Sequence, residues 1–530
     1  MFCLKCYIFP KQYLDIIYID ELVDSIQSNT SDLENLQMYQ FFEAVGTILS
    51  DRPPSLGQGQ REVDRPAALL RMMEVPNQIF NDIMNNAREN LEVLNTDDVL
   101  SELTRVLKIN TYVCSAVKGL YIHQLSNVFL DMLNLYQVYS EFISQQVEQY
   151  GEVATRHQNI KYMRLIKKEI LKLLTNFIEK SAGEIEAPPD TIATELIPPS
   201  LDPILTDYCT CVNGARDPEV LALCDMAIKT LQEHVLSHVP TIMERVFNVT
   251  LNMINQDDVS YPEHRIKFYS FIKTVNKYAF DAILVLPPED QKLVVDAIVW
   301  GFKHTDRNIA DMALDILYDL LVNVSRNEEM RQSFYVLYLK DLLENILIVM
   351  TDRLHKSGFN THAKLINYML FAVAKGEVTE PLYTEQEAPI GSLNNAEYLN
   401  EYMIDLLLNG FQTLTRNKLI PFVGGLFDLS KDFVAYKTHL RDFLIDLKEF
   451  SEENNAEWYA EENAQKLQEQ QELQMQNKAS VPGLLNPYEL KDNNEADTDD
   501  VQLNNLQLDG QSDGLGNTAS NNMINSGQGY

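Results

Sequence analysis

The chain has 530 residues, and its 43 Lys and Arg against 77 Asp and Glu give a formal net charge of −34. An acidic field of this size repels nucleic-acid phosphates and favours basic partners, so direct binding to DNA or RNA is not expected. No apolar run is long enough to span a bilayer, which predicts no membrane insertion. A signal peptide has an uninterrupted apolar core, whereas Lys5, Lys11 and Asp15 interrupt the apolar patches at the start of this sequence. We therefore expect a location inside the cell.

Composition favours a helical repeat protein. The length exceeds what one compact core normally holds, yet only 20 Gly and 20 Pro are available to divide the chain into separate globular domains. A stack of helical repeats resolves this conflict, because its core grows lengthwise. We therefore expect an all-α fold.

The first third of the chain predicts several helices after a divergent N-terminal segment, 1–15. Residues 16–50 contain two weak helical patterns, and the second offers a core face made of Tyr39, Phe42, Val45 and Leu49. A Pro/Gly/Gln-rich stretch, 51–66, is typical of a loop. Helices are then expected from about Pro76 and over 97–118 and 119–149.

The segment 158–180 predicts a helix with two distinct faces. Its apolar residues form one stripe: Met163, Ile166, Ile170, Leu173 and Phe177. Basic residues follow another side of the same helix: Lys161, Arg164, Lys168 and Lys172. This basic strip is either an ordinary solvated face or a binding site for an acidic partner surface or the chain's own acidic tail. If it binds a partner, charge reversal at Arg164 and Lys168 should weaken that contact.

The stretch from Asp258 to Leu321 predicts three successive helices joined by short turns. The apolar core stripes of the first, second and third helix include, respectively, Phe268, Ile272 and Val275; Leu293, Ala297, Ile298 and Gly301; and Ile309, Met312 and Ile316. Repeats are expected to begin near Glu219, Glu263 and Arg307, which are 44 residues apart. That interval is typical of HEAT or armadillo repeats, which bury their apolar faces only against neighbouring repeats.

The C-terminal part continues the array and then changes character. Gly424 and Gly425 lie in an apolar run without the Gly-Lys-Ser/Thr of a phosphate loop, so we interpret both as positions of close helix packing. We expect the repeat array to occupy 16–453. A helix almost without an apolar face follows at 454–478, and the Asp/Asn/Gly/Gln-rich tail 479–530 is predicted to be disordered.

Signatures of catalysis are missing from the sequence. The motifs HExxH, GxSxG, GxGxxG and paired CxxC do not occur, so neither an enzyme nor a cofactor site is predicted. Cys3 and Cys6 have the spacing of half a zinc site without a second pair, and free thiols are expected there rather than a metal. His264 and His304 are expected to cap or solvate helix ends.

Several long motifs resemble one known family. They are FEAVG, PNQIF, LDMLNLY, YPEHR, AIVWGFKHTDRNIAD, HLRDFLIDLKEF and SVPGLLNP, in order from about residue 42 to residue 487. From about residue 16 to 490 the chain is similar to the C-terminal portion of the exportin-1 family, nuclear export receptors of the importin-β superfamily. The resemblance implies a HEAT-repeat α-α superhelix, the fold class that we predict for this chain.

The resemblance also implies partners and a location. Members of the family bind Ran in its GTP form, carry proteins with leucine-rich export signals, and shuttle between nucleus and cytoplasm through contacts with nucleoporin Phe-Gly repeats. The principal Ran-binding repeats and the export-signal groove lie in the half of the family's length that this sequence does not resemble, so no cargo-binding residue is carried over. The alternative is a HEAT-repeat scaffold without transport activity that binds a basic protein partner.

Overall fold

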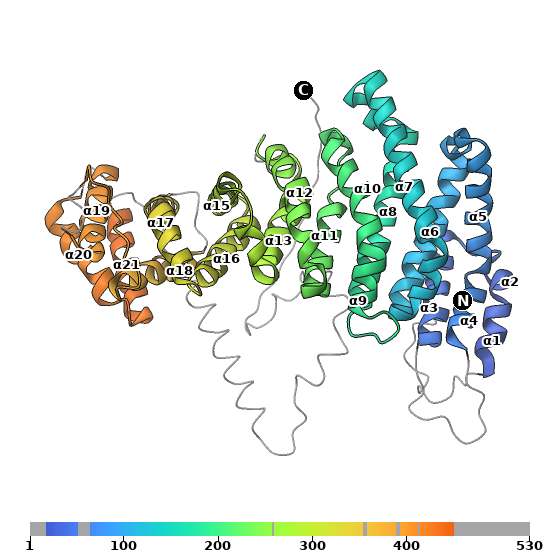
Figure 1. Cartoon of the computed structure of the whole chain (residues 1–530), viewed down its shortest axis with the longest axis horizontal. Helices are drawn as coiled ribbons and strands as arrows, with labels where there is room; N and C mark the ends of the chain where they lie inside the picture. The colour runs from blue at the N-terminus through green and yellow to red at the C-terminus, as the bar shows by residue number, and fades with distance from the viewer. Residues whose placement is uncertain are drawn as a thin grey trace, which may run out of the picture. The chain divides into compact units, whose positions relative to one another are not determined.

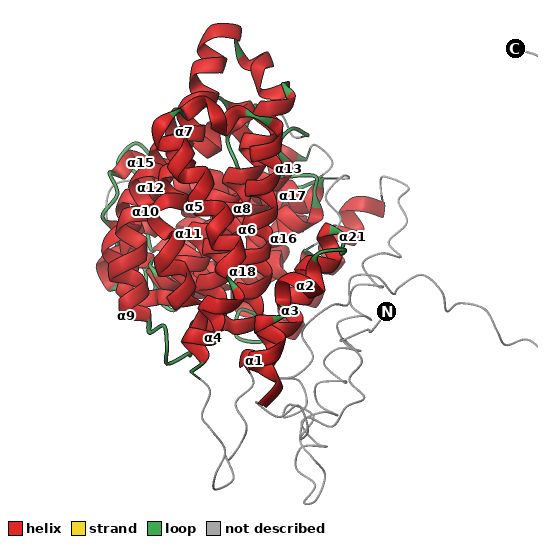
Figure 2. Ribbon diagram, turned by 90° about the vertical axis from the view of Figure 1, so that its right-hand side faces the viewer, coloured by secondary structure: helices red, strands yellow, loops and turns green. Residues whose placement is uncertain are grey.

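The structure, a computed structural model, describes residues 17–50, 64–256, 259–352, 358–387, 393–411 and 414–449. The predicted N-terminal segment 1–15, the helix 454–478 and the tail 479–530 lie outside these ranges, as do Cys3 and Cys6. Every regular element in the described ranges is helical, so the predicted all-α fold is confirmed (Figure 2).

The first eight helices include the predicted two-faced segment as the last of them. They are α1 (Ile17–Asp24), α2 (Ile26–Thr30), α3 (Asn35–Ser50), α4 (Arg65–Met72), α5 (Glu74–Glu89), α6 (Asp97–Val117), α7 (Ile122–Tyr150) and α8 (Gln158–Lys180). The predicted bounds of the two-faced helix, 158–180, are those of α8, and all five residues of its apolar stripe are buried.

The later helices carry the regular repeats. They are α9 (Pro189–Thr191), α10 (Ile197–Thr210), α11 (Glu219–Leu231), α12 (Val239–Ile254), α13 (Pro262–Tyr278), α14 (Phe280–Leu284), α15 (Pro288–Phe302), α16 (Arg307–Val324), α17 (Glu328–Thr351), α18 (Phe359–Ala374), α19 (Asn395–Gly410), α20 (Arg416–Asp428) and α21 (Phe433–Glu449). Helices α11, α13 and α16 begin within one residue of the three predicted repeat starts.

The helices stack side by side in two rows (Figure 1). One row runs α3, α6, α8, α11, α13, α16, α18 and α21, and each helix in it packs against the next. In the other row, α7 packs against α10 and α10 against α12. Helices of the two rows pair across the stack, as α15 does with α16 and α17 with α18, so each repeat buries its apolar face against its own partner and its neighbours.

The predicted core stripes are largely correct. Phe268, Ile272 and Ile316 are almost completely buried, whereas Leu293 and Met312 are only half-buried at the edges of their stripes. The short helix α14, which was not predicted, redirects the chain between α13 and α15. Gly301 permits a close approach, because a Cβ atom there would lie 2.6 Å from the ring of Tyr269.

Asparagine side chains tie neighbouring repeats together inside the stack. The amide of Asn276 on α13 donates to the carbonyl of Ile316 on α16 at 3.1 Å, and Asn323 on α16 donates to the carbonyl of Asn276 at 2.7 Å. Both asparagines are buried, so these bonds satisfy groups that would otherwise be costly to bury and fix the register of the two helices.

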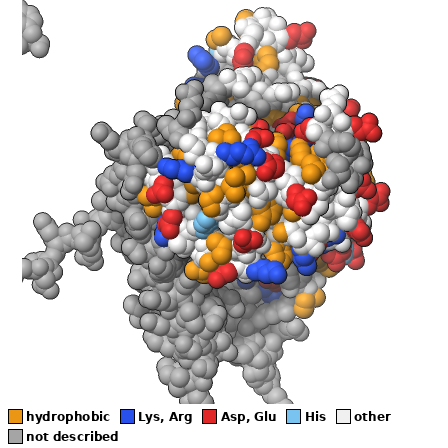
Figure 3. Space-filling view, turned by 90° about the vertical axis from the view of Figure 1, so that its left-hand side faces the viewer, with side chains coloured by type: hydrophobic (Ala, Val, Ile, Leu, Met, Phe, Trp, Pro, Cys, Tyr) orange, Lys and Arg blue, Asp and Glu red, His pale blue; other side chains and the backbone are white. Residues whose placement is uncertain are grey.

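The end of the stack near α20 and α21 differs from its interior. Hydrophobic side chains gather in a band across this end, between acidic and basic ones (Figure 3).

A Cβ atom on Gly425 would lie 2.4 Å from the ring of His439, which confirms the close packing predicted at that position. The same prediction is wrong for Gly424, because a Cβ atom there would meet nothing within 4 Å.

Candidate functional site

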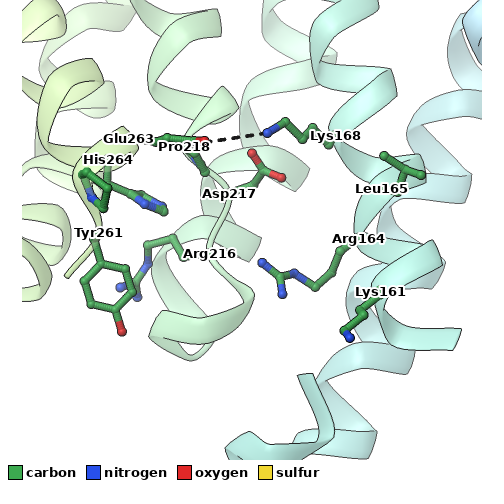
Figure 4. A pocket seen from close by; sticks show the side chains of 11 residues that line it. Lys161, Arg164, Leu165, Lys168, Arg216, Asp217, Pro218, Tyr261, Glu263 and His264 are labelled. Atoms are coloured by element: carbon green, nitrogen blue, oxygen red, sulfur yellow. Dashed lines mark ion pairs between the residues drawn. The ribbon is translucent and has the colours of Figure 1, made fainter. Parts of the chain in front are cut away.

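An open cavity of about 430 Å³ lies where three successive repeats meet (Figure 4). Helix α8, the loop between α10 and α11, and the first turn of α13 form its walls. Its lining residues are Lys161, Arg164, Leu165, Lys168, Arg216, Asp217, Pro218, Tyr261, Pro262, Glu263 and His264. We call this set the α8–α13 cavity.

The wall from α8 contains three of the four residues of the predicted basic strip. Lys161 is exposed, and the guanidinium of Arg164 extends from α8 toward the loop of Arg216 (Figure 4). Lys168 Nζ lies 3.7 Å from Glu219 Oε1 and 3.9 Å from Glu263 Oε2, so its charge is balanced by neighbouring repeats.

The structure separates Lys172 from the rest of the basic strip. It does not line the α8–α13 cavity, and its Nζ lies 3.5 Å from Glu169 Oε1 on the preceding turn of α8. The strip is therefore not one surface with one role. Whether any of its residues binds a partner stays a prediction.

The wall from the α10–α11 loop is held by Arg216, which is buried. Its guanidinium donates to the carbonyl oxygens of Tyr208 and Cys211 at 2.8 and 3.0 Å and to Asn213 Oδ1 at 2.6 Å. The next residue, Asp217, accepts a hydrogen bond from the backbone N–H of Glu219 at the start of α11. Burial raises the pKa of the Asp217 carboxyl above its usual value, although that hydrogen bond opposes the shift.

The wall from α13 begins with an unusual backbone. Tyr261 has φ +61° and ψ +46°, the left-handed conformation that non-glycine residues rarely adopt, at a cost of about 1–2 kcal/mol. Pro262 then opens the helix, and the ring of Tyr261 meets that of His264 edge to face, with centroids 5.9 Å apart. This geometry turns the first residues of α13 toward the cavity.

His264 corrects one prediction. Its side chain is only 6% exposed, so it is a buried wall residue and does not solvate a helix end. Burial lowers the pKa of His264 to about 4, and the charges of Arg216, Lys267 and Arg164 act in the same direction against a hydrogen bond to the main chain of Arg216. Its Nε2 has no hydrogen-bond partner among the described residues. His304, by contrast, accepts a hydrogen bond at Nδ1 from the N–H of Asp306, just before α16.

The depressed pKa of His264 predicts a pH-dependent stability. The unfolded chain takes up this proton near pH 6.5 but the folded chain only near pH 4, so the free energy of unfolding falls between these values, by up to about 3 kcal/mol. In a Trp458→Phe background, the fluorescence of Trp300 reports unfolding. We expect the denaturant midpoint to fall more between about pH 7.5 and pH 5 in the parent than in His264→Gln. Equal falls in both proteins would contradict this role.

A buried ion pair supports the site from behind. Lys167, the neighbour of Lys168 on α8, is 4% exposed, and its Nζ lies 2.7 Å from Asp207 Oδ2 on α10. The hydroxyl of Tyr136 on α7 donates to the same oxygen at 2.9 Å. These contacts join α7, α8 and α10 beside the basic strip, and they fix which face of α8 is directed toward the cavity.

Sequence reasoning identified one wall of the cavity and missed the others. Arg216, Asp217, Tyr261 and His264 come from repeats that are distant along the chain, and no pattern in the sequence placed them beside α8. Within the described residues, no group of three or more His, Cys, Asp or Glu could hold a metal ion. In the same part of the chain, no helix combines the length and apolarity that crossing a membrane requires.

Comparison with known proteins identifies the same family over most of the chain. Residues 124–452 match the family model described as CRM1 C terminal. The chain is 37% identical over 474 residues to Exportin-1 of Drosophila melanogaster, 35% over 474 residues to Exportin-1 of Schizosaccharomyces pombe, and 34% over 475 residues to Protein EXPORTIN 1B of Arabidopsis thaliana. Each alignment covers 89–90% of this chain but 43% of the relative, so the chain spans less than half the length of these proteins.

Proposed function

Because the chain belongs to the exportin-1 family of nuclear export receptors, we propose that it acts as the C-terminal repeat array of such a receptor. In this role it binds Ran in its GTP form and takes part in carrying proteins with leucine-rich export signals from nucleus to cytoplasm. The observation that supports the proposal most is the alignment itself, which continues through nearly the whole array at 34–37% identity. The family consists of transport receptors, which is consistent with the lack of catalytic motifs in the sequence.

The array offers protein partners extended surfaces, as a transport receptor requires. Stacked helices present side chains from several repeats at once, and the α8–α13 cavity is one place where three repeats contribute to a single surface. We extend the proposal to nucleoporin Phe-Gly repeats as further partners and to shuttling through nuclear pores. No residue of this chain is assigned to export-signal cargo.

A scaffold without transport activity is the second candidate. The net charge of −34 favours it, because a strongly acidic array attracts basic proteins in general and steers their association. Such a scaffold would bind a basic partner in a way that does not depend on the nucleotide carried by Ran.

A binding experiment separates the two candidates. The full chain, immobilised, is offered Ran loaded with a non-hydrolysable GTP analogue or with GDP, with and without an export-signal peptide. We expect retention of Ran in the GTP state only, without retention of the peptide. Equal retention in both nucleotide states, or in neither, would contradict the export-receptor proposal and favour the scaffold.

A further inference from the structure

We propose that the α8–α13 cavity binds an oxyanion on an extended acidic segment of a partner protein, with Arg164 as its anchor. The oxyanion is the carboxylate of an Asp or Glu side chain or the phosphate of a phosphorylated side chain, since both present oxygens that a guanidinium recognises. This proposal goes beyond export-receptor activity, and it holds whether or not the chain binds Ran.

Arg164 is the residue that carries the proposal. It is half-buried, and it makes no hydrogen bond or ion pair with another described residue. Its Nε is inaccessible to solvent and unpartnered. A guanidinium that extends into an open cavity and has no carboxylate partner in the described fold can pair with an anion that enters the cavity.

The contrast with neighbouring cations strengthens this reading. On the same helix, Lys167 pairs with Asp207, Lys168 with Glu219 and Glu263, and Lys172 with Glu169. Each of these lysines has a carboxylate within the fold. Arg164 lies among these lysines without a carboxylate partner. Its charge lowers the pKa of the Asp217 carboxyl, but the two side chains form no ion pair.

The electrostatic balance of the cavity favours an anion. Four cationic and two acidic side chains line it, and His264 is neutral at pH 7 because of its depressed pKa. Helices α11 and α13 both begin at the cavity, through Pro218 and Pro262, so the positive ends of two helix dipoles add to the field. In a chain of net charge −34, this is a local site for an acidic ligand.

The apolar part of the lining indicates a protein segment rather than a free ion. Leu165, Pro218, Tyr261 and Pro262 contribute apolar surface beside the charged groups. A volume of about 430 Å³ exceeds what a lone phosphate fills and suits a side chain together with part of its backbone.

Fluorescence anisotropy with labelled peptides of about twelve residues tests the proposal. The full chain is titrated with three peptides: one rich in Asp and Glu, one with a central phosphoserine in place of a Glu, and one in which every acid is replaced by its amide. The variants are Arg164→Ala and Arg164→Lys, with Lys172→Ala as the matched control, because Lys172 is basic and on the same helix but outside the cavity.

We expect the acidic peptide to bind, the amide peptide to bind at least about tenfold more weakly, and Arg164→Ala to weaken acidic binding by about tenfold or more. Arg164→Lys should recover only part of this loss, because an ammonium cannot replace a planar guanidinium fork. Lys172→Ala should stay within about twofold. Tighter binding of the phosphoserine peptide would identify phosphate as the preferred source, and tighter binding of the Glu peptide would identify carboxylate.

Two results would overturn the proposal. One is equal weakening by Arg164→Ala and Lys172→Ala, which would indicate non-specific attraction to a basic surface. The other is binding of the amide peptide as tightly as the acidic one. NMR of histidine ring carbons gives a second readout, because an anion in the cavity must raise the pKa of His264. A pKa of His264 unchanged by saturating acidic peptide would place that peptide elsewhere and contradict the proposal.

Discussion

Replacing Lys167 by methionine is expected to lower the free energy of unfolding of the central repeats by about 3–5 kcal/mol. The ammonium of Lys167 and the carboxylate of Asp207 are both nearly inaccessible, at 4% and 9% exposure, and their 2.7 Å contact joins α8 to α10. The substitution leaves Asp207 charged and buried with only the hydroxyl of Tyr136 as a side-chain donor. Hydrogen–deuterium exchange of peptides from α7, α8 and α10 in the full chain measures the effect.

Two further variants make the Lys167 prediction specific. The double variant Lys167→Met with Asp207→Leu removes both charges, so it should recover a large part of the lost stability. On α13, Lys273→Met removes an ion pair with Asp315 that is exposed at both ends, at 40% and 56%, and it should change the stability by no more than about 0.5 kcal/mol. Protection in Lys167→Met equal to that of the parent would show that the buried pair contributes nothing.

Replacing Arg216 by alanine is expected to destabilise the α10–α11 loop by about 3 kcal/mol, because hydrogen bonds to charged groups contribute about 1.5–3 kcal/mol each. Its guanidinium satisfies the carbonyl oxygens of Tyr208 and Cys211 at the C-terminal end of α10 and stacks 5.4 Å from the ring of Tyr208. In the variant the Cys211 carbonyl loses this donor, and the Tyr208 carbonyl keeps a long 3.8 Å contact from the Cys211 thiol. Exchange protection of residues 208–217 should fall more than that of α16 and α18, which lie several repeats away.

Control variants separate the role of Arg216 from that of any positive charge. Arg216→Lys should recover little of the stability, since one ammonium cannot reach both carbonyls and Asn213 with the geometry of the fork. Arg245→Ala on α12 should have little effect, because the one side-chain hydrogen bond that it makes within the described ranges is a long, exposed contact of 3.4 Å to Thr206. A loss in Arg245→Ala as large as that in Arg216→Ala would contradict the argument.

The arrangement at Arg216 recurs along the array. Arg265, also buried, donates from Nη2 to the carbonyl of Ile254, the last residue of α12, and to that of Ser260 in the following loop, each at 3.0 Å. Arg331 donates to the carbonyl of Ser325 after α16 and to that of Glu377. In each case an arginine donates to carbonyls at the end of a helix or in the segment that follows it, so the same arrangement recurs at successive repeat junctions.

The loop 376–396, between α18 and α19, makes contacts that its sequence alone does not predict. The loop is long and polar, which is typical of an insertion, but its described residues are attached to neighbouring helices. Gln332 Oε1 on α17 accepts from the N–H groups of Thr379 and Glu380, and Glu387 accepts from the hydroxyl of Tyr398 on α19. Hydrogen bonds to the Thr384 backbone and to Tyr398 hold the pKa of the Glu387 carboxyl at about 2. Polar residues here form ordered contacts that sequence composition cannot reveal.

The sequence by itself determined most of the long helices, the repeat interval and the family. Apolar spacing is a local property, so it defined both ends of α8 and placed the starts of α11, α13 and α16 to within one residue. The motifs that carried the resemblance are also local, and the comparisons confirmed them.

Only the tertiary structure decided which basic residues share a site and what each one does. Lys168 and Lys172 are equivalent in the sequence pattern, yet one faces carboxylates from two other repeats and the other faces Glu169 on its own helix. The sequence placed His264 at a helix end, but stacking buries it in a cavity that it shares with Arg164, about a hundred residues away along the chain. The physical reason is that periodicity specifies which face of a helix is buried, whereas the partners of a polar side chain depend on how neighbouring repeats are placed against that face.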